Sequence, residues 1–424
     1  MNLECLVKEH LSKLSLFSGD ISSADESVNE FVEGWRALGC QVLGEQLQAQ
    51  IDQVESKYKG ARQRRSRSYQ TPLGSLELTR RVYGSPGDCR VDTELGLPAD
   101  GWFTQLKELA SALGVSSEFA NANRLLECWS GVKVSEKTLA NHVERYGSEL
   151  IEAQAESDVD GVCPVLSSVT QATVPEPERP LFYVGADGIH TPLRNGKTRE
   201  AKVGVMFWES DHLRVSPKRC ILKRRDYVAT LEGVEPFRDQ LNRCYAQAVG
   251  QLPHQVVFPG DGAHWIWLMA ALLFPDAIQI LDFFHVSEYL WEVARLGFGE
   301  SQEQKAWVKT QQDRLKESDW SSVVQASQRL PPGSSELGKA VESLVSYLHN
   351  NQTRIDYQRY LEQGLMIGSG VVESSNRRIV TVRLKQSGMF WSKAGAQAVM
   401  SLRAAYLSAS STWHDFWHKK TVSA

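Results

Sequence analysis

The chain has 424 residues, of which 42% are hydrophobic and 23% are charged, and its formal net charge at pH 7 is −4. This composition is ordinary for a folded protein of two or three domains, so it excludes a disordered or collagen-like chain. The slightly acidic balance also excludes a molecule that binds nucleic acid over its whole surface. Any such binding must come from local basic patches.

Cysteine usage and the first residues indicate a soluble intracellular protein. The seven cysteines are irregularly spaced and include no C-x-x-C pair, which argues against a disulfide framework and against structural zinc. Charged residues interrupt the leucines of "MNLECLVKEHLSKLSLF", so an amphipathic helix is expected there and not a signal peptide. The longest apolar run, "WIWLMAALLF", is about half of the roughly 20 residues that a membrane span requires.

Residues 1–70 are expected to form a helical region that ends in a basic arm. Val28, Phe31, Val32 and Trp35 recur at helical spacing. The basic run "KYKGARQRRSRSYQ" reads either as a solvated linker or as an arm that contacts phosphates. Residues 71–100 follow as a short β element, because "GSLELTRRVYG" alternates apolar and polar residues before a Pro-Gly turn.

Residues 101–158 are expected to form a helix-turn-helix region that binds DNA. Gly131 ends one predicted helix, Ser135 is placed to cap the next, and Leu139 and Val143 lie on one face of it. Two helices joined by a short glycine-containing turn match this motif, although many helical bundles share the pattern. Residues 159–180 are rich in Pro, Ser and Thr and predict a linker.

The remainder of the chain predicts an α/β domain with a mixed sheet flanked by helices. In residues 181–297, the strands "LFYVGA", "AKVGVMFWES" and the basic "KRCILKRRDYV" come first, and "QVVFPG" and "AIQIL" then alternate with helices. This order is typical of an RNase H-like core. Residues 298–364 are expected to be a helical insertion, and residues 365–424 to complete the core with a C-terminal helix.

Three acidic residues stand at the ends of predicted core elements. Asp187 follows the first strand, Asp261 follows the fourth strand, and Glu373 opens the last long helix. A single Asp-Gly pair usually marks only a turn. In an RNase H-like sheet, however, the first and fourth strands are neighbours and a helix packs across them, which lets the three carboxylates converge. Carboxylate oxygens suit Mg²⁺, and a pair of such ions suits in-line phosphoryl displacement.

Three ordered blocks carry a resemblance to a known family. The blocks "ADGIHTPLRNGKTREAKVGVMF", "GDGAHWIWLMAALLFPDAIQILDFFHVSEYLW" and "GSGVVESSNRRIVTVRLKQSGMFWSKAGAQAVMSLRA" resemble the DDE transposases of bacterial insertion sequences, in the ISKra-type branch related to Mutator-like transposases. The resemblance covers roughly residues 70–410. It implies that Asp187, Asp261 and Glu373 form the catalytic, metal-binding triad. It also implies that Asp282 and His285 in "DFFH" belong to a secondary motif.

The chain departs from the family pattern at one place. Family members often carry two cysteines after the strand near residue 80, whereas this chain has only Cys89 there. The β element is therefore expected to be a degenerate zinc ribbon without zinc.

Basic residues cluster beside the predicted acidic site. Solvation on the surface is the ordinary interpretation of any single one, but a cluster favours phosphate binding because each neutralised phosphate releases counterions. Arg377 follows Glu373 by four residues, so it is placed to hold either the glutamate or a scissile phosphate. The predicted DNA-binding residues are Lys202, Arg377, Arg378, Arg383 and Lys385.

The resemblance implies an enzyme that cuts DNA at terminal inverted repeats and joins the released 3′-hydroxyl to target DNA. It would use two Mg²⁺ ions, with Mn²⁺ as a substitute, and act as a homodimer or higher oligomer on DNA in the bacterial cytoplasm. Two alternatives stay open. One is an RNase H-like nuclease without strand transfer, and the other is a non-catalytic DNA-binding protein derived from a transposase.

Overall fold

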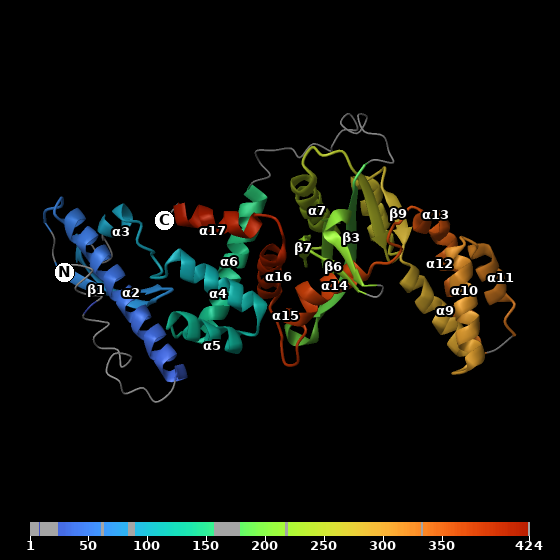
Figure 1. The fold of residues 1–424 in the computed structure, drawn as a ribbon, viewed down its shortest axis with the longest axis horizontal. Helices are drawn as coiled ribbons and strands as arrows, with labels where there is room; N and C mark the ends of the chain where they lie inside the picture. The colour runs from blue at the N-terminus through green and yellow to red at the C-terminus, as the bar shows by residue number, and fades with distance from the viewer. Residues whose placement is uncertain are drawn as a thin grey trace. The chain divides into compact units, whose positions relative to one another are not determined.

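The computed structural model describes residue 8 and residues 24–60, 63–83, 90–156, 179–216, 219–331 and 334–422. The chain forms two compact units (Figure 1). The first comprises Met1–Leu150 together with Thr412–Ala424, and the second comprises Ile151–Ser411. The expected N-terminal amphipathic helix, Cys89 and most of the expected linker lie outside the described residues. None of the described helices is long and apolar enough to cross a membrane.

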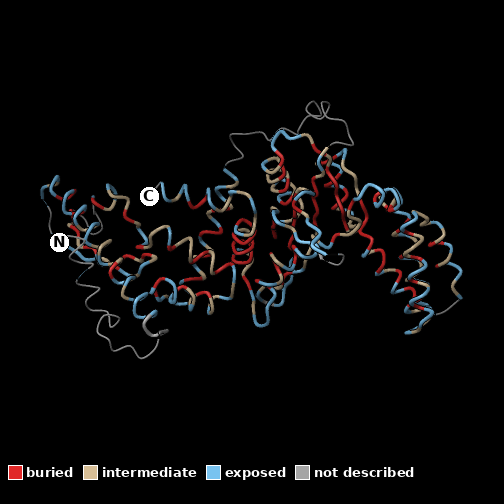
Figure 2. The backbone as a smooth tube through the Cα atoms, viewed as in Figure 1, coloured by how far each residue is buried: buried red, intermediate tan, exposed pale blue. Residues whose placement is uncertain are grey.

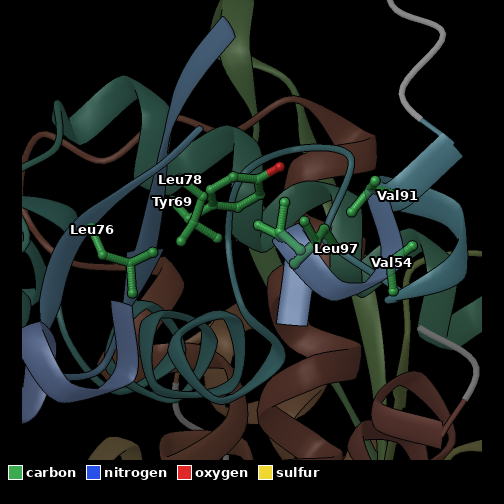
Figure 3. Close-up of a cluster of buried hydrophobic side chains, with 7 residues drawn as sticks. Val54, Tyr69, Leu76, Leu78, Val91 and Leu97 are labelled. Carbon is green, nitrogen blue, oxygen red and sulfur yellow. The ribbon is translucent and has the colours of Figure 1, made fainter. Parts of the chain in front are cut away.

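The first unit begins with a long helix packed on a β-hairpin. Helix α2 (Ala24–Glu55) is followed by the antiparallel strands β1 (Gln63–Thr71) and β2 (Gly74–Val82), and then by the short helix α3 (Arg90–Glu94). Apolar side chains from all four elements form one buried cluster (Figure 3). Its members are Ile51, Val54, Tyr69, Leu76, Leu78, Val91 and Leu97.

The basic run that was expected to be a linker or an arm is instead largely strand β1. Its pairing with β2 places Arg64 directly opposite Arg81, an arrangement that like charges destabilise. Glu55, which is only 1% exposed, offsets this repulsion by pairing with Arg64 at 3.4 Å and with Arg81 at 3.3 Å. Asp52 also pairs with Arg64, at 3.0 Å, so two carboxylates balance these two arginines within the protein.

The rest of the first unit is helical, as expected. It contains α4 (Thr104–Ser116), α5 (Phe119–Ser130) and α6 (Glu136–Glu156), with Gly131 in the left-handed conformation at the end of α5. The Ser135 hydroxyl accepts the Thr138 N–H at 3.0 Å and so caps α6. Leu139 and Val143 are fully buried. A helix, a turn and a capped helix are therefore present where a helix-turn-helix was predicted.

The C-terminal helix α17 (Thr412–Val422) packs with the first unit, not with the predicted catalytic core. The Trp413 indole N–H donates to Glu108 of α4 at 2.9 Å. Lys420 pairs with Glu149 of α6 at 2.5 Å. The sequence predicts that this helix belongs with the core, because it follows the core along the chain. Its contacts with α4 and α6 show that it packs with the first unit instead.

The second unit is built on a five-stranded mixed sheet. Strand β4 (Thr198–Trp208) pairs antiparallel with both β3 (Leu181–Pro192) and β7 (Asp226–Thr230), whereas β8 (Gln255–Gly260) and β9 (Ile278–Leu281) run parallel to β3. The order across the sheet is β7-β4-β3-β8-β9. Figure 2 shows that buried residues concentrate in these strands and along α16 (Lys393–Leu407).

Two glycines let helices approach the two faces of this sheet. A Cβ on Gly204 of β4 would lie 2.8 Å from Leu241 of α7 (Val234–Val249). A Cβ on Gly185 of β3 would overlap Val372 of α14 (Gly370–Asn376). Gly185 and Gly204 belong to opposite faces, because Gly204 pairs with Ala186 and successive strand residues point to opposite sides.

The third predicted core strand is divided in two. Within "KRCILKRRDYV", β6 (Arg219–Leu222) pairs with β5 (His212–Ser216) in a separate hairpin, and only β7 joins the main sheet. The basic residues between β6 and β7 interrupt the apolar pattern that a core strand requires.

The remaining elements of the second unit are helices. Helix α8 (His264–Leu273) connects β8 to β9. The predicted insertion contains α10 (Gln302–Lys316), α11 (Trp320–Gln328), α12 (Ser335–Asn350) and α13 (Tyr357–Glu362), preceded by α9 (Phe283–Phe298). After α14 the helix continues as a π-helical turn, η7 (Arg377–Thr381), and as α15 (Val382–Leu384). Short 3₁₀ turns are η4 (Arg194–Gly196), η5 (Glu209–Asp211) and η6 (Gln352–Arg354).

Candidate active site

Asp187 and Asp261 occupy matching positions on neighbouring parallel strands. The β3–β8 pairing runs from Leu181 opposite Gln255 to Tyr183 opposite Val257. Each aspartate lies four residues beyond this last pair, so the two are level across the sheet. Asp261 directly follows β8, as predicted, whereas Asp187 lies within β3, which continues to Pro192 in pairing with β4.

Helix α14 brings Glu373 toward the same position. The helix lies against β3 (Figure 1), and Val372 fits into the space above Gly185. Asp187 is two residues beyond Gly185 and therefore points to the same face of the sheet. The Asn376 side-chain amide donates to Asp187 Oδ2 at 2.5 Å. Glu373 precedes Asn376 by one helical turn and shares its face of the helix.

The charges of Asp261 and Glu373 both act on Asp187. The pKa of Asp187 is raised, first because the side chain is partly buried and then because the charges of Asp261 and Glu373 repel its ionised form. Hydrogen bonds from the Gly188 N–H, at 2.6 Å, and from Asn376 act in the opposite direction. The structure thus places negative charges from three distant segments within mutual range.

The three carboxylates supply oxygen donors, but these are not closely grouped. Among the residues that the structure describes, no three carboxylate, imidazole or thiol groups are gathered tightly enough to hold a metal ion. Asp261 uses one oxygen to accept the Ala263 N–H at 2.9 Å, and Glu373 is exposed. Mg²⁺ commonly takes only one or two protein carboxylates, with waters and substrate phosphates as its other ligands. The donor chemistry therefore fits this cation.

The Asp282 carboxylate is buried and hydrogen-bonded within the protein, so its role is structural. It is 1% exposed and caps α9 by accepting the N–H groups of Phe284 at 2.6 Å and His285 at 3.3 Å. Its second oxygen accepts the Ser369 N–H at 3.0 Å and the Ser369 hydroxyl. Asp282 thereby joins α9 to the turn that precedes α14, which positions the helix that carries Glu373.

His285 belongs to an aromatic group beside Asp261. Its ring lies 5.9 Å from that of Tyr347 in α12, and Tyr347 stacks on Tyr289 at 4.5 Å. The Tyr347 hydroxyl donates to the Asp261 carbonyl oxygen at 2.6 Å. Neither Tyr347 nor Asn376 was singled out from the sequence. Tyr347 lies 86 residues from Asp261 and carries no motif, whereas the spacing of Asn376 from Glu373 was a usable signal.

Two of the five predicted DNA-binding cations are buried. Lys202 is 5% exposed, lies on the α7 face of the sheet with its ammonium 3.9 Å from the Trp265 ring centroid, and pairs with Glu200 at 2.7 Å. Arg383 is 1% exposed and lies 4.8 Å from the Trp391 ring centroid. Neither side chain is therefore exposed on the surface of this structure, and their contact with DNA stays a prediction.

The other three predicted cations remain accessible. Arg377 and Lys385 are exposed, and Arg378 is half-buried. Arg377 follows Glu373 with ordinary helical spacing, since its backbone N–H donates to the Glu373 carbonyl oxygen. Among the described residues the two side chains form no ion pair, so of the two partners considered for Arg377 the glutamate is not contacted.

Comparison with known proteins assigns a family. The model of the uncharacterised protein family UPF0236 matches residues 26–421. The chain belongs to this family. The match of this UPF0236 member spans both structural units. No curated protein matches it. Among solved structures it is similar to the Drosophila P element transposase strand transfer complex, with 12% identity, 78% of this chain and 82% of that chain covered, and a TM-score of 0.25. A TM-score this low supports no conclusion about function.

Proposed function

We propose that the protein is a DDE-type DNA transposase whose catalytic residues are Asp187, Asp261 and Glu373. The proposal is supported by the arrangement of these carboxylates: Asp187 and Asp261 are level on adjacent parallel strands, and Glu373 comes from α14, which packs on β3 and β4. The order β7-β4-β3-β8-β9, in which only β4 runs antiparallel to the other four strands, is the order expected of an RNase H-like core.

Asp187, Asp261 and Glu373 would hold Mg²⁺ or Mn²⁺, most simply as two ions shared between them and the substrate phosphate. Bound cations of this kind stabilise the attacking and leaving oxygens of an in-line phosphoryl displacement. The protein contributes orientation. Asn376 fixes the Asp187 carboxylate, Tyr347 fixes the backbone at Asp261, and Asp282 fixes the start of α14.

Recognition of the DNA ends is assigned to the first unit. The α5-turn-α6 segment supplies a capped second helix of the kind that enters a major groove. The paired arginines of the β-hairpin argue against the basic run as the main phosphate contact. Self-association on DNA is part of this proposal, since two element ends must be brought together.

A non-catalytic DNA-binding protein derived from a transposase is the second candidate. It is favoured by one observation, namely that the described acidic groups are not gathered closely enough to hold a metal ion. A nuclease without strand transfer would share the same three carboxylates.

The test is a cleavage and joining reaction on DNA that carries the inverted repeats flanking the open reading frame. The full chain with Mg²⁺ or Mn²⁺ is expected to cut at the repeat ends and join them to a target plasmid. Asp187→Asn and Glu373→Gln should each lower the rate by more than about 100-fold, the upper range for groups that only orient a metal ligand. Asp276→Asn, in an exposed turn, is the matched control. Cutting without joining supports the nuclease, and DNA binding without any cutting supports the non-catalytic protein.

A further inference from the structure

Arginines from three distant segments converge beside α14. Arg225 directly precedes β7, Arg378 lies in η7 and Arg403 lies in α16. The Arg403 guanidinium donates from Nε to the Arg378 carbonyl oxygen at 2.6 Å and so fixes the π-helical turn. The Arg225 guanidinium carbon lies 5.8 Å from the ring centroid of Tyr227, which is itself 5% exposed. Arg225 and Arg378 are both half-buried, and both lie near Tyr227: burial raises the pKa of its hydroxyl, and the positive charges of Arg225 and Arg378 oppose that rise.

This arginine cluster lies on the same face of the sheet as Asp187. Tyr227 pairs with Val205, and Val205 pairs with Gly185, so the three residues form one row across β7, β4 and β3. Gly185 faces α14, as Asp187 does. From strand spacing and rise, the Cα of Tyr227 lies roughly 12 Å from that of Asp187. That separation corresponds to about three to four base-pair steps of DNA.

Arg225 and Arg378 form no ion pair with another part of the chain that the structure describes. The pKa of Arg225 is lowered, first by burial and then by the charge of Arg378, which lies close enough to repel it. Asp226 points to the opposite face, where its carboxylate accepts the Ser410 N–H at 2.7 Å. On that face the pKa of the Cys244 thiol is raised, first by burial and then by the charge of Asp226. Within the described ranges, no carboxylate forms an ion pair with Arg225 or Arg378. Partly buried charges are ordinarily paired, so this arrangement fits an external anion.

We propose that Arg225 and Arg378 bind a backbone phosphate of the DNA strand that enters the Asp187 site, with Arg403 holding Arg378 in place. The inference rests on the proposed function for the identity of the substrate. The proposal adds a phosphate contact at a stated distance from Asp187. The contact comes from Arg225 and Arg378, which do not belong to one sequence motif. Bidentate guanidinium groups suit phosphate geometry better than lysine does.

The test is a binding measurement that does not depend on cleavage. Fluorescence anisotropy with a labelled DNA duplex of arbitrary sequence is recorded for the full chain between about 50 and 200 mM salt. The Arg225→Gln and Arg378→Gln double variant is expected to bind about tenfold or more weakly at low salt, with the slope of log K against log salt reduced by about one. Arg224→Gln is the matched control, because this exposed neighbour already pairs with Asp211 at 3.2 Å.

The possible outcomes distinguish the phosphate site from the proposed transposase activity. An unchanged slope in the double variant and in both single variants overturns the phosphate site, whether or not the protein cuts DNA. A reduced slope in a protein that never cuts DNA rejects the enzyme and retains the site. Tighter binding of an RNA duplex of the same sequence, or no duplex binding at low salt, overturns the assignment to DNA. Thermal unfolding of each variant shows whether a loss of binding reflects a loss of fold.

Discussion

The side-chain amide of Asn376 donates to the carboxylate of Asp187 across 189 positions of sequence. This bond joins α14 to the central strand of the sheet and favours the charged form of Asp187, while burial and two neighbouring carboxylates favour the neutral form. Glu373 lies on the same helix. The hydrogen bond therefore helps to position Glu373 and also affects the pKa of Asp187.

Replacing Asn376 tests this link. Asn376→Ala removes a hydrogen bond to a charged group, which typically contributes about 1.5–3 kcal/mol. We expect the free energy of unfolding to fall by an amount of that order, and divalent-cation-dependent cleavage to fall about 10–100-fold. Denaturant unfolding and the cleavage assay measure the two effects. Unfolding and cleavage that both match wild type would show that the bond does not organise the site.

Asp187 should make stability depend on pH. Its folded pKa is raised above the ordinary value of 3.8, so the folded state binds more protons than the unfolded chain between the two values. The contribution of this residue to stability is fully present below pH 3.8 and is lost as the pH rises through the folded pKa. Asp187→Asn is therefore expected to unfold at a higher temperature than wild type at neutral pH in EDTA. The difference should shrink on acidification, and a constant or reversed difference would contradict the assignment.

Divalent cations should relieve the repulsion among the three carboxylates. Adding Mg²⁺ or Mn²⁺ to the full chain is expected to raise its melting temperature by mass action, because a cation that binds only the folded state stabilises it. The Asp261→Asn and Glu373→Gln double variant should lose most of this increase. An equal increase in wild type and variant, measured by calorimetry with Asp276→Asn as the control, would place the cation elsewhere.

Tyr347 should position Asp261 through the backbone. Tyr347→Phe keeps the aromatic stacking on Tyr289 and removes only the hydrogen bond to the Asp261 carbonyl oxygen. We expect a stability loss of about 1 kcal/mol and a larger proportional loss of kcat than of substrate affinity. Tyr289→Phe is the matched control within the same stack. Equal kcat in the two variants would limit Tyr347 to a packing role.

Asp282 should be required for folding of the second unit and not for cation binding. Its carboxylate accepts bonds from two α9 N–H groups and from Ser369 while almost fully buried. Asp282→Ala leaves these donors unpaired, and we expect a loss of about 2–4 kcal/mol in the free energy of unfolding. The increase in melting temperature caused by Mg²⁺ should persist in the folded fraction of the variant. Its disappearance there would make Asp282 a cation ligand.

Periodic and punctuating residues made much of the architecture predictable. Apolar runs such as "QVVFPG" and "AIQIL" predicted β8 and β9, and the polar helical spacing of residues 298–364 predicted the insertion. The same patterns failed where charge and burial conflict. The basic run near residue 65 became a strand because pairing with β2 and the buried Glu55 offset its repulsion, which no local pattern reveals.

The sequence by itself determined most of the strands and helices and marked three acidic positions, because these depend on residue type and short-range spacing. Only the tertiary structure decided which charges meet. Lys202 and Arg378 are both basic residues beside the acidic motif, yet one is buried against Trp265 on the far face and the other lies half-buried with Arg225 near Asp187. Strand register and helix packing set these neighbours, and both depend on contacts between residues that are far apart along the chain.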